Sequence, residues 1–104
     1  PEARFAGMNG GTISRNTAVA QQGVFALLPD FDFDLQYRVT GFSILYTDRM
    51  GDFEEPATGS NLTPRQKDLL NRLTRGKYLT IKDIKAIGPD NRTIDLSAMV
   101  FKID

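Results

Sequence analysis

The sequence predicts an α+β domain made mainly of antiparallel β-sheet, in a sandwich-like arrangement, with one packed α-helix at about residues 64–75. Several stretches alternate apolar and polar residues with a period of two, which is typical of half-buried strands. One stretch carries both the start and the stop signals of a helix, and turn-forming residues separate the others. The 104 residues contain no repeat and no linker-like tract, so a single domain over 1–104 is expected.

Short strands are expected in the first third of the chain. Turn signals at Gly10-Gly11 and at residues 21–23 delimit extended runs near 12–14, 18–20 and 24–28.

The clearest predicted strand begins near Leu35 and changes its apolar phase at Gly41. Apolar side chains occupy the odd positions from 35 to 39 and the even positions from 42 to 46. A glycine at such a change indicates a β-bulge, which lets one long strand contribute to two core surfaces.

Residues 48–61 are expected to form a loop, because Gly51, Pro56 and Gly59 are all turn-forming residues. A short edge strand near Phe53-Glu54 is the regular element expected inside it. The loop leads directly into the predicted helix.

The helix is predicted by its ends. Thr63 is the expected N-cap, Pro64 occupies the first helical position, and Gln66 completes a T-x-x-Q capping box. Gly76 is the expected residue after the C-cap. An apolar stripe for docking on the sheet is formed by Leu69, Leu70 and Leu73.

Two further strands are predicted after the helix. The first covers 77–87, and its apolar phase slips between Ile81 and Ile84, which indicates a second bulge. The turn signal at 88–91 leads to the second, over 93–103, which has apolar residues on both faces. Such a strand is central in a sheet or contacts something outside the fragment.

The composition excludes several classes of function. The chain has neither histidine nor cysteine, so the usual catalytic triads, the usual zinc, iron–sulfur and haem sites, and disulfides are excluded, and no cofactor is expected. Its 13 basic and 13 acidic side chains argue against a nucleic-acid partner. The balance conceals an asymmetry, since residues 1–62 carry 8 acids and 4 bases and residues 63–104 carry 5 acids and 9 bases.

An acidic run at residues 30–34 (DFDFD) is the most conspicuous local motif. In an extended strand Asp30, Asp32 and Asp34 share one face, which suggests a calcium site or a pair of catalytic carboxylates. The EF-hand pattern fails, however, because its sixth and twelfth positions are Leu35 and Gly41. An amphipathic strand whose aspartates are solvated or contact basic groups is the preferred interpretation, and no metal site is predicted.

A basic cluster is expected on the predicted helix. Arg65, Arg72 and Arg75 lie on one side of it, with Asp68 between them. This cluster is a candidate docking face for an acidic partner, although a solvated helix face explains it as well. The aspartates at 30, 32 and 34 are the corresponding acidic candidates for contact with a partner.

Taken in order, several blocks resemble the C-terminal domain of the GldM/PorM family. They are residues 4–7 (RFAG), 10–13 (GGTI), 28–35 (LPDFDFDL), 37–39 (YRV), 62–67 (LTPRQK) and 84–90 (IKAIGPD). The resemblance extends over the whole chain, and the FDFDL and DIKA-x-GPD blocks are its most specific parts.

The resemblance implies a non-enzymatic part of the type IX secretion and gliding-motility machinery of Bacteroidetes. Family members are anchored in the inner membrane, homodimerise and cross the periplasm. Their membrane segment pairs with a GldL-like motor subunit, and their last domain reaches a ring of GldK- and GldN-like proteins. The chain begins at Pro1 and contains no span of ~20 apolar residues, so the membrane anchor is expected to lie outside this fragment.

Two alternatives from other functional classes remain open. A small β-module of this size could bind a carbohydrate or calcium. A hydrolase could use Asp32 and Asp34 as its two carboxylates.

Overall fold

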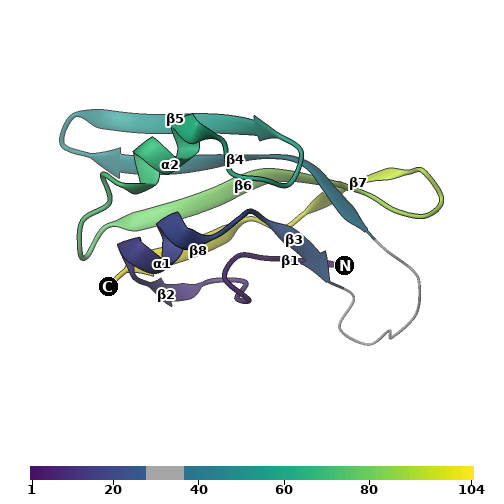
Figure 1. The fold of residues 1–104 in the computed structure, drawn as a ribbon, viewed down its shortest axis with the longest axis horizontal. Coiled ribbons are helices and arrows are strands. Elements are labelled where there is room, and N and C mark those ends of the chain that lie inside the picture. The colour runs from purple at the N-terminus through teal and green to yellow at the C-terminus, as the bar shows by residue number, and fades with distance from the viewer. Residues whose placement is uncertain (28–36) are drawn as a thin grey trace.

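A computed structural model of the chain describes residues 1–27 and 37–104. Its main sheet has six strands in the order β2-β8-β6-β4-β5, with β7 also paired to β6, and β1 and β3 form a separate two-stranded sheet (Figure 1). The strands are β1 (Glu2–Arg4), β2 (Gly11–Ile13), β3 (Phe25–Leu27), β4 (Arg38–Asp48), β5 (Gly51–Thr58), β6 (Tyr78–Ile87), β7 (Thr93–Leu96) and β8 (Met99–Ile103). The helices are α1 (Arg15–Ala20) and α2 (Pro64–Leu70). The predicted α+β class, dominated by antiparallel sheet, is confirmed.

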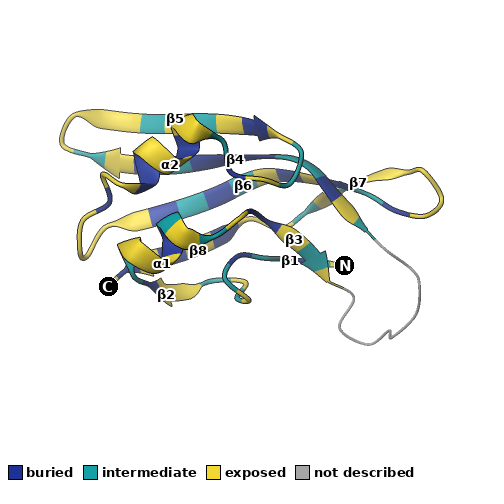
Figure 2. Cartoon of the chain, viewed as in Figure 1, coloured by how far each residue is buried: buried dark blue, intermediate teal, exposed yellow. Residues whose placement is uncertain are grey.

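Both helices lie on the same face of the main sheet, and the core lies between the helices and that face (Figures 1 and 2). Phe5, just after β1, contacts Phe101 of β8 edge to face, with 5.8 Å between ring centroids. The domain is elongated, with extents of 43 × 22 × 20 Å. Its long axis follows the hairpin formed by β4 and β5 (Figure 1).

The two predicted bulges are confirmed. The register between β4 and β6 shifts on either side of Gly41, and the apolar residues of β4 on both sides of it are buried. In β6 the second bulge contains Asp83, whose φ of 52° lets Ile81 and Ile84 both face the core. The strand predicted from Leu35 is β4, which begins at Arg38; Tyr37 is not part of it, and residues 28–36 lie outside the described part.

The predicted helix starts as expected but ends five residues early, at Leu70 rather than at 75. Beyond it, Arg72 N donates to Leu69 O and Leu73 N to Leu70 O, so the chain tightens into turns. These turns bury Leu73 and lead to Gly76, where φ is +87°. The helix ends at Leu70 because the chain after it has to turn back toward β6.

The predicted strand at 18–20 is wrong, because residues 15–20 form helix α1. Ser14 is its N-cap and accepts a hydrogen bond from Thr17 N at 3.1 Å. Ala18 is fully buried. A run of six residues is too short for its apolar spacing to distinguish a helix from a strand. The runs near 12–14 and 24–28 correspond to strands β2 and β3.

The short edge strand expected near Phe53-Glu54 is confirmed, but it extends over Gly51–Thr58 as β5, so the predicted loop at 48–61 is wrong over most of its length. Just after β5, Gly59 N donates to Thr40 O of β4. Since backbone groups alternate along a strand, the nitrogen of Pro56 then faces away from β4, where a missing N–H costs nothing. Pro56 is compatible with this strand because β5 is at the edge of the sheet.

The predicted strand at 93–103 is split into β7 and β8 by residues 97–98. β8 lies between β2 and β6, so the expectation of a central position is confirmed for this part. Only one of its faces is buried, however: Met99, Phe101 and Ile103 face the core, whereas Val100 is half exposed.

Candidate partner-binding surface

Helix α2 is held against the edge strand β5 by a buried glutamine. Gln66 is completely buried, and its Nε2 donates to the backbone oxygen of Glu55 at 2.9 Å. Its Oε1 accepts from Thr63 N at 3.1 Å, and its own N donates to Thr63 Oγ1 at 3.0 Å, which completes the predicted capping box. One side chain therefore both caps the helix and sets its position on the sheet.

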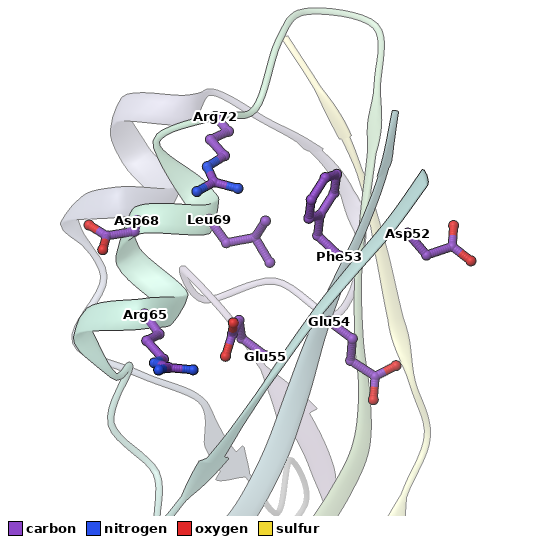
Figure 3. A pocket seen from close by; sticks show the side chains of 8 residues that line it. All are labelled: Asp52, Phe53, Glu54, Glu55, Arg65, Asp68, Leu69 and Arg72. Atoms are coloured by element: carbon purple, nitrogen blue, oxygen red, sulfur yellow. The ribbon is translucent and has the colours of Figure 1, made fainter. Parts of the chain in front are cut away.

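A cleft of ≈ 320 Å³ separates α2 from β5. Figure 3 shows Arg65, Leu69 and Arg72 projecting into it from the helix side, with Phe53 and Glu55 opposite them on the strand. Most residues that line the cleft are charged, and Phe53 and Leu69 are its apolar members.

The two arginines of the cleft present exposed guanidinium groups. The Cζ of Arg72 lies 5.7 Å from the centroid of the Phe53 ring, a cation–π distance that orients the guanidinium. Figure 3 shows Arg65 on the side of Glu55. Among the described residues, neither Arg65 nor Arg72 has an ion pair within 4.0 Å. Both remain available to carboxylates of another molecule.

The other acidic residues of β5 point to the opposite side of the strand (Figure 3). Glu54 forms an ion pair with Lys82 of β6 at 2.9 Å, and its hydrogen bond raises the pKa of that lysine. Asp52 accepts a hydrogen bond from Thr47 at 2.7 Å. Glu55 and Asp68 line the cleft as well, but none of these four carboxylates lies within 4.0 Å of the guanidinium nitrogens of Arg65 or Arg72.

The structure separates the three arginines predicted as one helical cluster. Arg65 and Arg72 line the same cleft, but Arg75 lines a different hollow beside Arg15 of α1. The expectation of a single side of one helix is wrong because α2 ends before both Arg72 and Arg75. The acidic candidates Asp30, Asp32 and Asp34 lie outside the described residues.

Sequence reasoning found the strand side of the cleft only in part. Phe53 belongs to the short edge strand that was expected inside the loop, but the full extent of β5, which includes Glu55, was not expected. A usable signal was present: Asp48 and Gly51 flank only two residues, Arg49 and Met50, which is the commonest length of a hairpin turn.

In residues 1–27 and 37–104, no group of three or more acidic side chains is arranged to hold a metal ion. Because the aspartates of the calcium hypothesis lie outside these ranges, that hypothesis is not tested. No helix in the described ranges is long and apolar enough to cross a membrane.

Comparison with protein-family models decides the family. The model of the GldM C-terminal domain matches residues 1–104, which is the whole chain. The chain belongs to this family. A comparison with curated proteins found no match.

The GldM family is a structural component of a multi-protein complex that acts in type IX secretion and gliding motility. It is membrane-anchored and periplasmic, and it is not a known enzyme family. The elements described above are therefore those of a GldM C-terminal domain, and the cleft between α2 and β5 is its candidate surface for a protein partner.

Proposed function

We propose that this GldM C-terminal domain is a non-enzymatic periplasmic interaction domain that links an inner-membrane motor to a ring associated with the outer membrane. The ring partners in this proposal are GldK- and GldN-like proteins. The GldL-like motor subunit is reached through the full-length protein, which homodimerises and carries its membrane anchor outside residues 1–104.

The observation that carries the proposal is the cleft between α2 and β5. Arg65 and Arg72 are exposed there without an ion pair among the described residues, beside the partly exposed ring of Phe53. Arginines beside an aromatic ring are typical of residues that dominate binding energy at interfaces. Gln66 holds α2 at a fixed distance from β5, so the cleft loses little conformational entropy when a partner binds.

Charge reversal in the cleft tests this function. The purified domain is bound to an immobilised ring complex of GldK- and GldN-like proteins, and its affinity is measured by biolayer interferometry. The double variant Arg65→Glu/Arg72→Glu is expected to weaken binding at least about tenfold, because two attractive contacts become repulsive.

Lys67→Glu is the matched control, since Lys67 is exposed on the same helix but does not line the cleft. It is expected to retain the wild-type affinity, and circular dichroism checks that each variant is folded. Wild-type affinity of the double variant would remove the cleft from the proposal. A wild-type domain that does not bind the ring complex would remove the partner.

The three aspartates at 30, 32 and 34 are proposed as a second set of partner contacts, on the basis of sequence alone. Their substitution by asparagine is measured in the same binding experiment, and unchanged affinity would contradict this role. Calorimetry with calcium and with a panel of glycans tests the alternative of a small-ligand module. Heat of binding or a raised melting temperature would favour that alternative.

A further inference from the structure

Four segments that are far apart in the sequence meet at one end of the domain. They are the start of α1, the turn between β4 and β5, the chain that follows α2, and the residue before β6. In Figure 1 this end is on the left, where the C-terminus also lies. We call it the basic end, and it is defined by Arg15, Arg49, Arg72, Arg75 and Lys77.

The surface of the basic end is continuous and hollowed. Arg15 and Arg75 line a hollow of ≈ 360 Å³, and Arg49, Arg72 and Lys77 line another of ≈ 400 Å³. Thr74 lines both hollows, so the two adjoin each other. Five positive groups are thus presented on one connected surface.

The positive charge of this end is not neutralised within the described part of the chain. All five basic residues are exposed, and the ion pairs of residues 1–27 and 37–104 involve other cations, namely Arg4, Lys82, Lys85 and Arg92. The acidic residues that line the two hollows are Asp48 and Asp104, so the side chains of the basic end carry three more positive than negative charges. Asp48 is already engaged, since its Oδ1 accepts from Met50 N at 2.7 Å.

Backbone hydrogen bonds hold these segments in place. Gly76 N donates to Ile103 O at 2.8 Å, and Ile103 N donates to Lys77 O at 2.8 Å. Asp104 N donates to Ile13 O at 2.9 Å, which connects the end of β8 to the start of α1. The backbone that carries the cations is therefore organised before any partner arrives, which lowers the entropic cost of binding.

We propose that the basic end binds a protein segment rich in aspartate and glutamate. Four of its five cations are arginines, whose planar guanidinium groups can donate two parallel hydrogen bonds to one carboxylate. Met50 at the hairpin turn is 84% exposed and offers one apolar contact beside them. A hollowed surface with hydroxyl groups between its cations fits side chains that project from a polypeptide better than it fits a flat lipid surface. The basic end is distinct from the cleft between α2 and β5. Arg72 is the one residue that lines both.

Fluorescence anisotropy with a labelled peptide of alternating Glu and Ser residues tests the proposal. The matched peptide contains Gln in place of Glu. The domain is expected to bind the Glu peptide, more weakly as salt is added, and to bind the Gln peptide at least about tenfold more weakly. Amide shifts in NMR spectra are expected at residues 14–16, 48–50 and 71–77.

Two double variants leave Arg72 intact: Arg49→Glu/Lys77→Glu and Arg15→Glu/Arg75→Glu. Each is expected to weaken binding of the Glu peptide at least about tenfold. The control is Arg38→Glu, an exposed arginine at the opposite end of β4, roughly 35 Å away along the strand. It is expected to leave the affinity unchanged.

The proposal would be overturned if the domain bound the Glu and Gln peptides equally well. It would also be overturned if Arg38→Glu reduced the affinity for the Glu peptide as much as the two double variants do. Binding to phosphatidylglycerol vesicles but not to the Glu peptide would also overturn it, in favour of a lipid surface. Arg65→Glu separates this site from the cleft, because it is expected to weaken binding of the ring complex and not of the peptide. Failure of one proposal is therefore distinguishable from failure of the other.

Discussion

The two faces of the main sheet differ sharply, although they are made by alternate residues of the same strands. On the face under the helices, Leu79, Ile81 and Phe101 are completely buried. On the other face their sequence neighbours Tyr78 and Val100 are 55% and 50% exposed. Figure 2 shows this alternation along the strands. Both helices pack on the same side, so one face carries the core and the other contributes mainly surface.

The exposed face is joined across its strands by ion pairs. Lys82 pairs with Glu54 at 2.9 Å, and Lys85 of β6 pairs with Asp95 of β7. Exposed pairs of this kind contribute little to stability, because water screens them. The difference between the two faces predicts that substitutions of adjacent residues on one strand lower the free energy of unfolding by very different amounts.

The largest effect is expected from Phe101→Ala, compared with Val100→Ala on the same strand. Phe101 is completely buried against Phe5, so its removal leaves a cavity and costs about 3–5 kcal/mol of the free energy of unfolding. Val100→Ala is expected to cost about 0.5 kcal/mol. Urea unfolding measures both values, and similar costs would contradict the assignment of one covered and one exposed face.

An intermediate effect is expected where the covering helix is attached to the sheet. Gln66→Leu removes the hydrogen bond to Glu55 O and half of the capping box, at a cost of about 1–3 kcal/mol. Thr63→Ala removes the other half of the box alone and is expected to cost about 1 kcal/mol. If chemical unfolding gave Gln66→Leu no larger cost than Thr63→Ala, the bond to β5 would contribute nothing to stability.

The smallest effect is expected from the ion pair on the exposed face, and it depends on pH. The hydrogen bond and charge of Glu54 raise the pKa of Lys82 above its ordinary value of 10.5. Stabilisation by this pair is therefore fully present below pH 10.5 and is lost as the pH rises through the higher pKa of the folded protein. In Lys82→Met the loss of stability above pH 10.5 should be smaller than in the wild type. If the free energy of unfolding of the two proteins fell equally with pH above 10.5, the pair would contribute nothing to stability.

Local signals predicted the elements that depend on local chemistry. The start of α2 follows from Thr63, Pro64 and Gln66, because a capping box closes within four residues. The bulges in β4 and β6 follow from a change in the phase of the apolar residues, from odd to even positions or the reverse. Residues of both phases can face the same side of the sheet only if an extra residue is inserted between them.

The errors arose where neighbours in space decided the structure. Residues 51–58 contain a glycine and a proline, yet they form a strand because β4 pairs with them and an edge position tolerates Pro56. Residues 15–20 form a helix because Ser14 caps it and Ala18 is buried in the core. Helix α2 ends at Leu70 because the chain has to bury Leu73 and return to β6.

The sequence by itself determined the class of fold, the start of α2, the bulges, and the lack of histidine and cysteine chemistry, since each depends on composition or on residues within a few positions. It also showed an excess of basic residues in the second part of the chain. Only the tertiary structure decided where the charges meet. It placed Arg72 over Phe53 and kept Arg75 out of the cleft that Arg65 lines. It also brought Arg15 and Arg49 of the acidic first part to the basic end. The reason is physical: a binding surface depends on distances between side chains, and strand pairing and helix packing set those distances between residues far apart in the chain.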